Sequence, residues 1–483
     1  MPPFLTRWLP LALIATLALG LRVWGLDRRP MHADEANQAV KAGQLLEGQG
    51  YAFDPADHHG PTLYYAVLPL ARLRGQATLA ALTETTVRLV PAIAGTAAVA
   101  LLFFFALPLG RWPALAAAAF LALSPPAVYY SRYFIQESLL LCFTLAALVC
   151  AARWWRSGRL GWAVAAGVCA GLMQATKGSA LVFFAAAVAG LVLARPGRPA
   201  SPRLLRDGVG ALVSASLIAG LFYSSFGTNL HGLTDALTTY ASFGQRLLAG
   251  TGHEKPWWYY LSLFGWQRTG GVATHQLAFT ALASAGVAVA VSTSRNAILR
   301  WAAGYTAFLF IALSFTPYKT PWHAIHFVPG LALLAAGALA ALPERATSRF
   351  LAFGLGLAAL FSQAQQVRLT SFLRPADERN PYAYVHTSPD VLKLRAQVET
   401  ALALSPTAPV RVISEEVWPL PWYLRGLPNV GYWTAVPGDC DGALVIVSAG
   451  LADAVRARLH GNYETGFVGL RPGFTLVVFK PKP

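Results

Sequence analysis

Residues 8–38 read WLPLALIATLALGLRVWGLDRRPMHADEANQ, an apolar run that ends in a cluster of charged side chains. The apolar part, from about Trp8 to Leu26, is long enough to cross a hydrocarbon core of roughly 30 Å. Many further apolar runs follow it, so a retained span is favoured over a cleaved signal peptide. His32, Asp34 and Glu35 then lie where the chain would leave the bilayer.

The composition is that of a membrane protein. The 483 residues are 55% hydrophobic and 12% charged, whereas soluble domains carry about a quarter charged residues. The net charge of +16 does not indicate a nucleic-acid partner, because membrane topology itself requires Arg-rich loops. Disulfides are not predicted, since Cys142, Cys150 and Cys169 lie in apolar runs and Cys440 has no evident partner.

About eleven apolar runs satisfy the length rule for membrane spans. They are residues 8–26, 85–107, 112–130, 135–152, 159–176, 178–194, 208–226, 273–293, 297–315, 324–342 and 349–366. We therefore expect an α-helical polytopic membrane domain over residues 1–370, with a large first external loop at 27–84. Residues 61–74 and 256–268 are too short or too polar to span, and their aromatic and Arg side chains favour interfacial helices.

The Arg-rich short loops set the orientation. Residues 153–159, 195–206, 294–300 and 343–349 are rich in Arg and alternate with poorer loops, which places them and the N-terminus on the cytoplasmic side of a cytoplasmic (inner) membrane. The first loop departs from this rule because it also carries several basic residues, but long loops obey the rule less strictly.

Residues 371–483 differ in character and predict a small soluble α/β domain. Runs rich in β-branched residues within 408–418, 441–450 and 474–481 indicate strands, and residues 388–404 and 451–460 have helical apolar spacing. An odd number of spans would place this domain on the extracytoplasmic side.

The polar residues that membrane spans do not explain fall in the predicted external loops. Ionisable residues beside spans are costly and tend to be functional. We therefore predict a site at the membrane surface, open to a hydrophilic acceptor and a lipid-borne donor. The residues proposed to bind substrate or phosphate are His32, His58, His59, Arg132, Tyr133, Glu137, Lys177, Lys319, Trp322 and His323.

Asp34 and Glu35 have both a structural and a catalytic interpretation. They open an amphipathic segment, so Asp34 would be a helix N-cap and Glu35 would favour the helix dipole. A carboxylate here would also serve as a general base if an acceptor hydroxyl came within hydrogen-bond reach. For the bare pair, the capping interpretation is the commoner one.

The cations and the remaining ionisable residues also have alternatives. Arg132 is either a snorkelling arginine or a bidentate phosphate ligand, while Lys177 and Lys319 either anchor the interface or bind phosphate. Glu137 pairs with Arg132, binds a metal or contacts the acceptor. A divalent metal ion is a possible cofactor, with Asp34, Glu137 and His323 as its candidate ligands, but the spacing of the histidines, including His323 and His326, is not diagnostic.

These loops resemble those of GT-C fold glycosyltransferases, which include protein O-mannosyltransferases, aminoarabinose transferases of lipid A and catalytic subunits of oligosaccharyltransferases. The shared layout is a first span, an acidic pair in the first external loop, and then interfacial helices. The set HADEA, DHHGPTLYY, LSPPAVYYSRYF, ATKGS, PYKTPWHAIHF and PWYLRG is similar to that of the flippase-activity-associated protein family of archaeal and bacterial glycosylation.

The resemblance implies an inverting glycosyltransferase with a polyprenyl-phosphate sugar as donor and a protein, lipid or glycan as acceptor. Asp34 matches the acid that deprotonates the acceptor hydroxyl, with Glu35 in support, and the cations would stabilise the phosphate leaving group. Two positions depart from the expected pattern: Gly178 follows Lys177 where an acid is expected, and Glu137 stands where relatives often have aspartate.

Two rival functions remain. A non-catalytic partner would help to flip or present a lipid-linked glycan without needing the Asp34 carboxylate. A transporter usually has charged or broken-helix positions near the bilayer midplane, whereas here the charges cluster near one predicted surface, so the transporter ranks last.

Overall fold

The computed structural model describes residues 3–55, 59–248, 254–292, 296–343 and 345–482. The chain forms two compact units, and both are discontinuous in sequence. Unit 1 comprises Met1–Trp24, Gly50–Ala66 and Arg88–Pro375, and unit 2 comprises Gly25–Gln49, Val67–Val87 and Ala376–Pro483. The first loop therefore contributes residues to both units.

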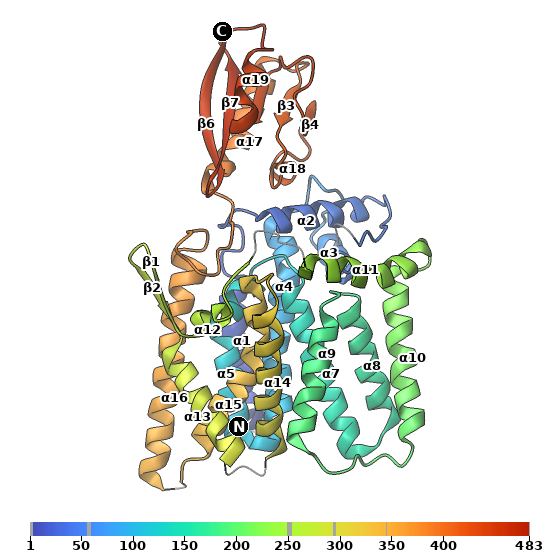
Figure 1. Cartoon of the computed structure of the whole chain (residues 1–483), viewed down its shortest axis with the longest axis vertical. Helices are drawn as coiled ribbons and strands as arrows, with labels where there is room; N and C mark the ends of the chain where they lie inside the picture. Colours follow the sequence, from blue (N-terminus) through green and yellow to red (C-terminus); the bar gives the residue numbers. More distant parts are fainter. Residues whose placement is uncertain (1–2, 56–58, 249–253, 293–295, 344, 483) are drawn as a thin grey trace. The chain divides into compact units, whose positions relative to one another are not determined.

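Unit 1 is built mainly from helices (Figure 1). Its longer helices are α1 (Pro3–Val23), α4 (Glu84–Ala106), α5 (Arg111–Ala122), α7 (Glu137–Ser157), α8 (Leu160–Gln174), α9 (Ala180–Ala194), α10 (Leu204–Tyr223), α13 (Leu277–Ser292), α14 (Ala297–Phe315), α15 (Val328–Ala340) and α16 (Ala346–Val367). The shorter elements are η1 (Leu107–Leu109), α6 (Pro125–Ser131), α11 (His231–Leu248), α12 (Tyr259–Phe264), β1 (Trp266–Thr269), β2 (Val272–His275), η2 (Pro321–His326) and η3 (Arg368–Leu373). The helix α3 (Thr62–Leu73) is divided between the two units after Ala66.

Among the described residues, six helices are long and apolar enough to cross a membrane, and the bent pair α5–α6 would make a seventh. Shorter apolar helices occur at Trp8–Val23, Leu160–Gln174, Ala180–Ala194 and Leu277–Ser292. The chain is thus a multi-pass membrane protein, and each of the predicted spans overlaps one of these helices. The number of spans, eleven, stays a prediction.

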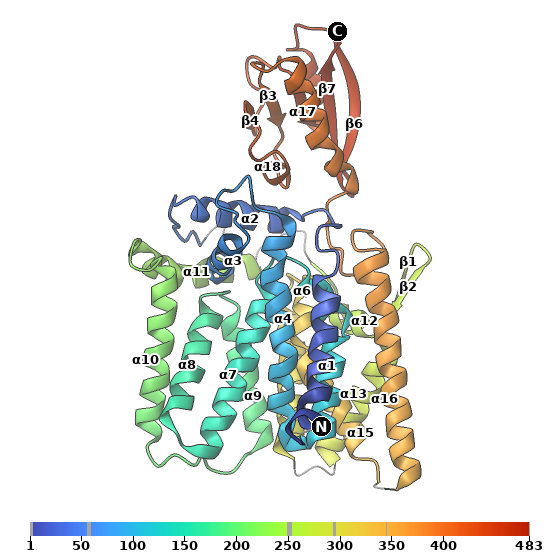
Figure 2. The ribbon, with the colours of Figure 1, turned by 180° about the vertical axis from the view of Figure 1, so that it is seen from behind.

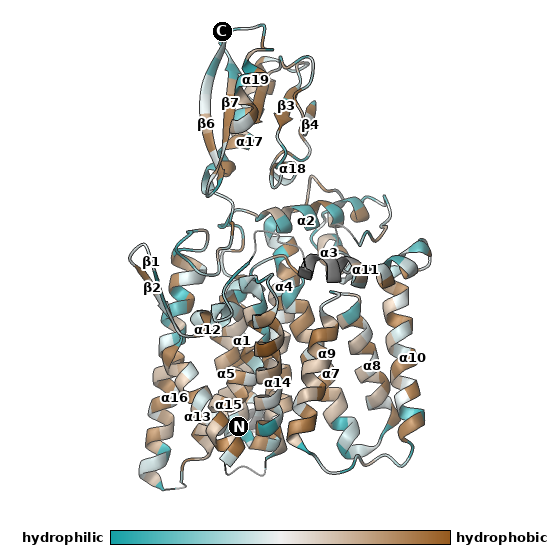
Figure 3. Ribbon diagram, in the orientation of Figure 1, coloured by the Kyte–Doolittle hydropathy of each residue, from teal (hydrophilic) through white to brown (hydrophobic). Residues whose placement is uncertain are grey.

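Small residues let the helices of unit 1 approach closely, as is common between membrane helices. A Cβ on Gly167 of α8 would lie 2.1 Å from the Ala211 carbonyl oxygen of α10, and one on Gly286 of α13 would lie 2.0 Å from that of Leu334 in α15. Figure 2 shows α7, α8 and α10 side by side, and Figure 3 shows that the helices of unit 1 are mostly hydrophobic.

A proline pair breaks the span at α5–α6. Ser124 is extended (φ −66°, ψ 125°), and Pro125 and Pro126 start α6 after a bend of 57°. Proline has no amide hydrogen to donate and disfavours helical backbone in the residue before it, so the helix ends there and restarts in a new direction. The restarted helix leads directly to Arg132 and Glu137.

Unit 2 contains a five-stranded sheet in the order β4-β3-β5-β7-β6. β3 pairs in parallel with β4 and β5, whereas β7 pairs antiparallel with β5 and β6. Its elements are α2 (Ala33–Leu46), η4 (Pro389–Lys393), α17 (Leu394–Leu404), β3 (Val410–Ile413), α18 (Leu420–Tyr423), β4 (Val430–Trp433), β5 (Leu444–Ser448), η5 (Ala449–Leu451), α19 (Ala452–Arg456), β6 (Tyr463–Arg471) and β7 (Phe474–Pro481).

The predicted strands and helices of the C-terminal region are confirmed, and its core consists of alternating inward residues such as Ile413, Val445, Val447 and Phe479. β4 and β6 are strands that the sequence analysis did not predict. The first loop adds α2 to this unit, where the Glu47 carboxylate accepts the Leu79 amide hydrogen at 2.7 Å.

Candidate active site

The acidic segment of unit 2 begins α2 with a capping box, so the expected cap, Asp34, was wrong. His32 is the N-cap: its Nδ1 accepts the Asp34 backbone N–H at 3.1 Å, and Glu35 Oε2 accepts the His32 backbone N–H at 3.1 Å. This reciprocal pair satisfies two amide groups that the first turn of a helix leaves without partners.

The two acids of the pair have different environments. The Glu35 side chain is fully buried, and its carboxylate pairs with Arg29 at 3.3 Å as well as accepting the His32 amide. The Asp34 side chain is 53% exposed. Of the two acids, Asp34 is therefore the one with an accessible carboxylate, and Glu35 fixes the start of the helix.

His32 is a buried capping residue. Burial lowers the pKa of His32, with the charges of Arg29 and Arg471 acting in the same direction and those of Asp34 and Glu35 opposing them. The neutral ring suits its role because Nδ1 must accept a hydrogen bond. His386 packs against the ring edge to face, with centroids 5.8 Å apart.

In unit 1, a buried ion pair joins Glu137 to Lys177. Glu137 lies in the first turn of α7 and Lys177 lies between α8 and α9; Lys177 Nζ is 2.6 Å from Glu137 Oε1, with side chains 10% and 1% exposed, respectively. Of the three alternatives for Glu137, the pairing with Arg132 is therefore wrong, because its ion-pair partner is Lys177. Glu137 Oε2 is buried and makes no hydrogen bond within the described part of the chain.

Two histidines of η2 lie near this pair. His323 Nε2 is 4.0 Å from Glu137 Oε1, and its Nδ1 lies 3.3 Å from both Tyr260 Oη and Thr320 Oγ1. The His326 ring is buried against Phe183, with centroids 4.2 Å apart, and neither ring nitrogen has a hydrogen-bond partner among the described residues. Glu137, Lys177 and His323 thus lie together in one largely buried polar cluster.

Arg132 donates hydrogen bonds at the C-terminal end of α1. Its Nη1 donates to the carbonyl oxygens of Leu21 and Trp24 at 3.1 and 2.7 Å, and its guanidinium lies 4.7 Å from the centre of the Phe372 ring. The last carbonyls of an α-helix have no partners within the helix and carry partial negative charge, so Arg132 stabilises the C-terminal end of α1. Its assignment to phosphate stays a prediction.

Lys319 also binds backbone carbonyls. Its Nζ donates to Lys255 at 2.9 Å and to Thr316 at 2.5 Å, which joins the loop before α12 to the loop after α14. The remaining predicted ligands are less defined. Tyr133 is buried against Tyr130, with ring centroids 5.9 Å apart; Trp322 is half-buried, His59 is exposed, and His58 lies outside the described residues.

Two of the three predicted metal ligands, Glu137 and His323, lie in unit 1 beside a competing cation. Glu137 and His323 contribute two ligand groups, and the Lys177 ammonium lies on the carboxylate oxygen that His323 approaches. A cation at that oxygen would be repelled by the ammonium.

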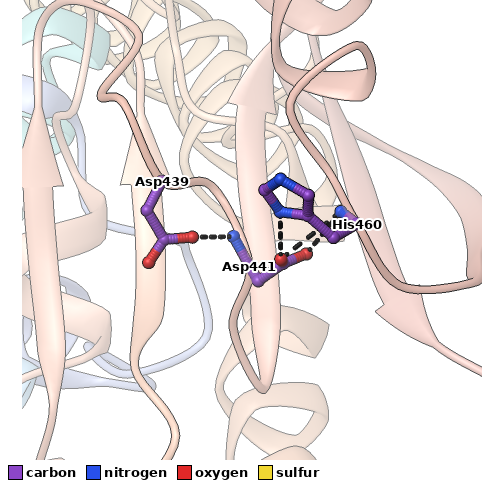
Figure 4. A group of neighbouring side chains, drawn as sticks. All are labelled: Asp439, Asp441 and His460. Atoms are coloured by element: carbon purple, nitrogen blue, oxygen red, sulfur yellow. Dashed lines mark hydrogen bonds and ion pairs between the residues drawn. The ribbon is translucent and has the colours of Figure 1, made fainter.

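Another group of metal-ligating residue types lies in the C-terminal sheet region. Asp439, Asp441 and His460 bring their ligand atoms within 4.8 Å of one another (Figure 4). Each carboxylate already has partners: Asp439 pairs with Arg411 at 2.6 Å, and Asp441 binds His460 Nδ1 at 2.8 Å and Tyr463 Oη at 3.2 Å. These side-chain contacts join the loop that carries Asp439 and Asp441 to the loop that carries His460.

The sequence analysis missed three side chains that shape these regions. Arg22, inside the first apolar run, is fully buried and donates to the Ala122 carbonyl at 3.2 Å near the end of α5; a charge within an apolar run was a signal for it. Tyr423 and Thr387 bind the backbone of Met31. Tyr423 lies in the PWYLRG stretch noted above, but no local pattern predicted that either side chain contacts the first loop.

Known proteins share the fold of this chain. Residues 12–195 match the family model of dolichyl-phosphate-mannose-protein mannosyltransferase. The chain superimposes on ArnT from Cupriavidus metallidurans in its apo state with a TM-score of 0.69 at 16% identity, covering 98% of both chains. The same protein bound to undecaprenyl phosphate gives 0.66 at 17% identity over 97% of both chains.

A second similar structure is the oligosaccharyltransferase AglB from Archaeoglobus fulgidus in complex with an inhibitory peptide and a dolichol-phosphate. It gives a TM-score of 0.57 at 13% identity and covers 96% of this chain and 73% of its own. No curated protein matches the chain in sequence. These likenesses and the helical architecture show that the chain has the GT-C glycosyltransferase fold.

Proposed function

We propose that the chain is an inverting membrane glycosyltransferase that moves a sugar from a polyprenyl phosphate to an acceptor hydroxyl. The family model supports this because it describes a transferase that uses a lipid phosphate sugar and covers residues 12–195. ArnT with undecaprenyl phosphate and AglB with dolichol-phosphate support a lipid phosphate donor.

The observation that carries the proposal is the contrast between the two adjacent acids. Asp34 is half-exposed at the start of α2, whereas its neighbours His32 and Glu35 are buried and hydrogen-bonded to the backbone. A general base needs an accessible carboxylate in a fixed position. Asp34 has both properties, and Glu35 has only the second.

In the proposed step, the Asp34 carboxylate takes the proton of the acceptor hydroxyl while the oxygen attacks the anomeric carbon. A bond forms between this oxygen and the anomeric carbon, and the bond from that carbon to the phosphate oxygen breaks with inversion. The electron pair leaves with the polyprenyl phosphate. Phosphate is a good leaving group, so its charge needs stabilisation rather than a separate acid.

We assign that stabilisation to Lys177. Arg132 and Lys319 already donate to backbone carbonyls, whereas the ammonium of Lys177 donates one of its three N–H bonds to Glu137. The Glu137 carboxylate then orients Lys177, and His323 lies beside both. A peptide hydroxyl is the favoured acceptor, because the family model describes a protein mannosyltransferase and AglB binds an inhibitory peptide.

The reaction would take place on the extracytoplasmic side of the cytoplasmic membrane. The Arg-rich loops within 153–159 and 195–206 support this orientation, because an odd number of spans then exposes unit 2 on the opposite side. The acceptor would reach Asp34 from water, and the donor would arrive in the lipid.

The test measures sugar release from labelled polyprenyl-phosphate sugars by the purified wild type and by Asp34→Asn. Asp390→Asn is a matched control: Asp390 lies in the first turn of a helix, its backbone N–H is accepted by the N-cap Ser388, and its side chain is 50% exposed. A parallel reaction with EDTA tests for a metal requirement.

We expect turnover in the wild type and in Asp390→Asn, and none in Asp34→Asn, with all three proteins equally well folded. An active Asp34→Asn would overturn the assignment of the base. Donor binding without turnover of any sugar would instead favour a partner that presents lipid-linked glycans.

A further inference from the structure

The two peptide groups that flank Met31 are hydrogen-bonded to side chains from the C-terminal part of unit 2. The Met31 backbone N–H donates to Tyr423 Oη at 2.7 Å, and Thr387 Oγ1 donates to the Met31 carbonyl oxygen at 2.6 Å. Met31 itself is fully buried. It lies three positions before Asp34, so these two hydroxyls act at the start of the acidic segment.

The segment that provides Tyr423 is itself fixed within unit 2. Tyr423 ends α18, which packs against α2. The neighbouring Trp422 is fully buried and donates through Nε1 to Glu84 Oε1 at 2.8 Å, and Arg425 donates to the Leu82 carbonyl at 2.6 Å. Both segments of the first loop in unit 2 therefore bind the same C-terminal element.

A shift of Met31 would be passed on to Asp34. His32 caps the helix, and its amide is bound by Glu35, whose carboxylate is paired with Arg29. All three side chains are buried. Among residues 31–36, Asp34 is the exposed one. Its carboxylate is carried by the capped turn and therefore moves when that turn moves.

We propose that Tyr423 and Thr387 are positioning residues for Asp34, so that the C-terminal domain sets the geometry of the catalytic acid. This inference rests on the proposed function of Asp34 as the general base. The domain is then part of the catalytic apparatus and does more than cover the site. Loss of either hydroxyl displaces Asp34 and slows the chemical step, while binding of the lipid donor is unaffected.

The test compares Tyr423→Phe with Tyr463→Phe in the full-length protein. Both hydroxyls accept a backbone N–H within unit 2, from Met31 at 2.7 Å and from Gly442 at 3.1 Å, respectively. Tyr463 belongs to the network of Asp441 and His460, which we have assigned no role in the reaction. Thr387→Val and Thr387→Ser form a second pair, in which serine restores the hydroxyl.

Two readouts are required: kcat and KM for the donor, and hydrogen–deuterium exchange of the amides of residues 31–36. We expect Tyr423→Phe and Thr387→Val to lower kcat by about 10- to 100-fold, because misplacement by 1 Å can cost 100-fold. KM should stay unchanged and exchange at 31–36 should increase. Tyr463→Phe and Thr387→Ser should behave like the wild type in both readouts.

An ordinary structural role predicts a different pattern, in which the variants lower the melting temperature but leave kcat per folded molecule unchanged. That result, or unchanged exchange at residues 31–36, would overturn the inference. If the wild type gives no turnover, the proposed function fails instead. Hydrogen–deuterium exchange then tests the positioning role by itself. Unchanged exchange at residues 31–36 in Tyr423→Phe would show that Tyr423 does not hold this segment.

Discussion

At the scale of single residues, the Glu137–Lys177 pair contributes to protein stability and, in the proposed reaction, to stabilisation of the phosphate. Glu137 is 1% exposed and its partner is 2.6 Å away, and leaving a buried charge without its partner costs about 3–5 kcal/mol. We expect Lys177→Met to lower the free energy of unfolding by an amount of that order, measured by thermal unfolding in detergent. The double variant Glu137→Gln/Lys177→Met should recover most of the stability but not sugar transfer. Lys177→Met with wild-type stability would contradict the buried pair.

His32 makes the start of α2 sensitive to pH. Burial and the charges of Arg29 and Arg471 hold its pKa below the ordinary value of 6.5, against the charges of Asp34 and Glu35. Because the folded-state pKa is depressed, the contribution of His32 to stability is present above pH 6.5 and lost as the pH falls through the folded-state pKa. We expect exchange of amides 31–36, corrected for intrinsic rates, to rise on acidification. His32→Asn, a cap that does not titrate, should abolish this rise; the same rise in that variant would refute the prediction.

At the scale of elements, close contact between α13 and α15 depends on Gly286. A Cβ there would lie 2.0 Å from the Leu334 carbonyl oxygen, which belongs to backbone and must move with its helix. We expect Gly286→Ala to destabilise the protein by about 1–3 kcal/mol, as overpacking does. Gly354→Ala on α16 is the control, because a Cβ there meets nothing within 4 Å; thermal unfolding should show it unchanged or slightly stabilised. Equal melting temperatures for both variants would argue against this helix contact.

At the scale of the whole molecule, the proposed orientation places Arg198 and Glu464 on opposite sides of the membrane. Both positions are exposed. Starting from a variant without its four cysteines, we expect Glu464→Cys to react with an impermeant thiol reagent in intact spheroplasts and Arg198→Cys to react only after lysis. The reverse pattern would invert the topology, and labelling of both in intact cells would exclude an odd number of spans between the two positions.

The sequence predicted the local features of this molecule well. Apolar runs located the long apolar helices because length and hydropathy are local properties, and β-branched runs located β3, β5 and β7 for the same reason. The loop that carries Asp34 was also singled out by its charges beside a span. The exact cap was not, because the choice of His32 over Asp34 depends on side-chain geometry.

What the sequence could not predict depends on contacts between distant segments. Arg132 stabilises the end of α1, about a hundred positions away, and Tyr423 binds Met31 across 392 positions. Such pairs leave no periodic pattern in the chain. The sharing of the first loop between two units has the same origin, because it is set by tertiary packing alone.

The hydrogen bond between Met31 and Tyr423 also fixes an order of events during biosynthesis. Its two residues are 392 positions apart, and a ribosome that adds roughly 5–20 residues per second needs about 20–80 s to make the chain between them. Throughout that interval the nascent first loop lacks the groups that will hold it. A chain truncated before the C-terminal sheet would therefore be inserted in the membrane while the start of α2 lacks its hydrogen bonds to Tyr423 and Thr387.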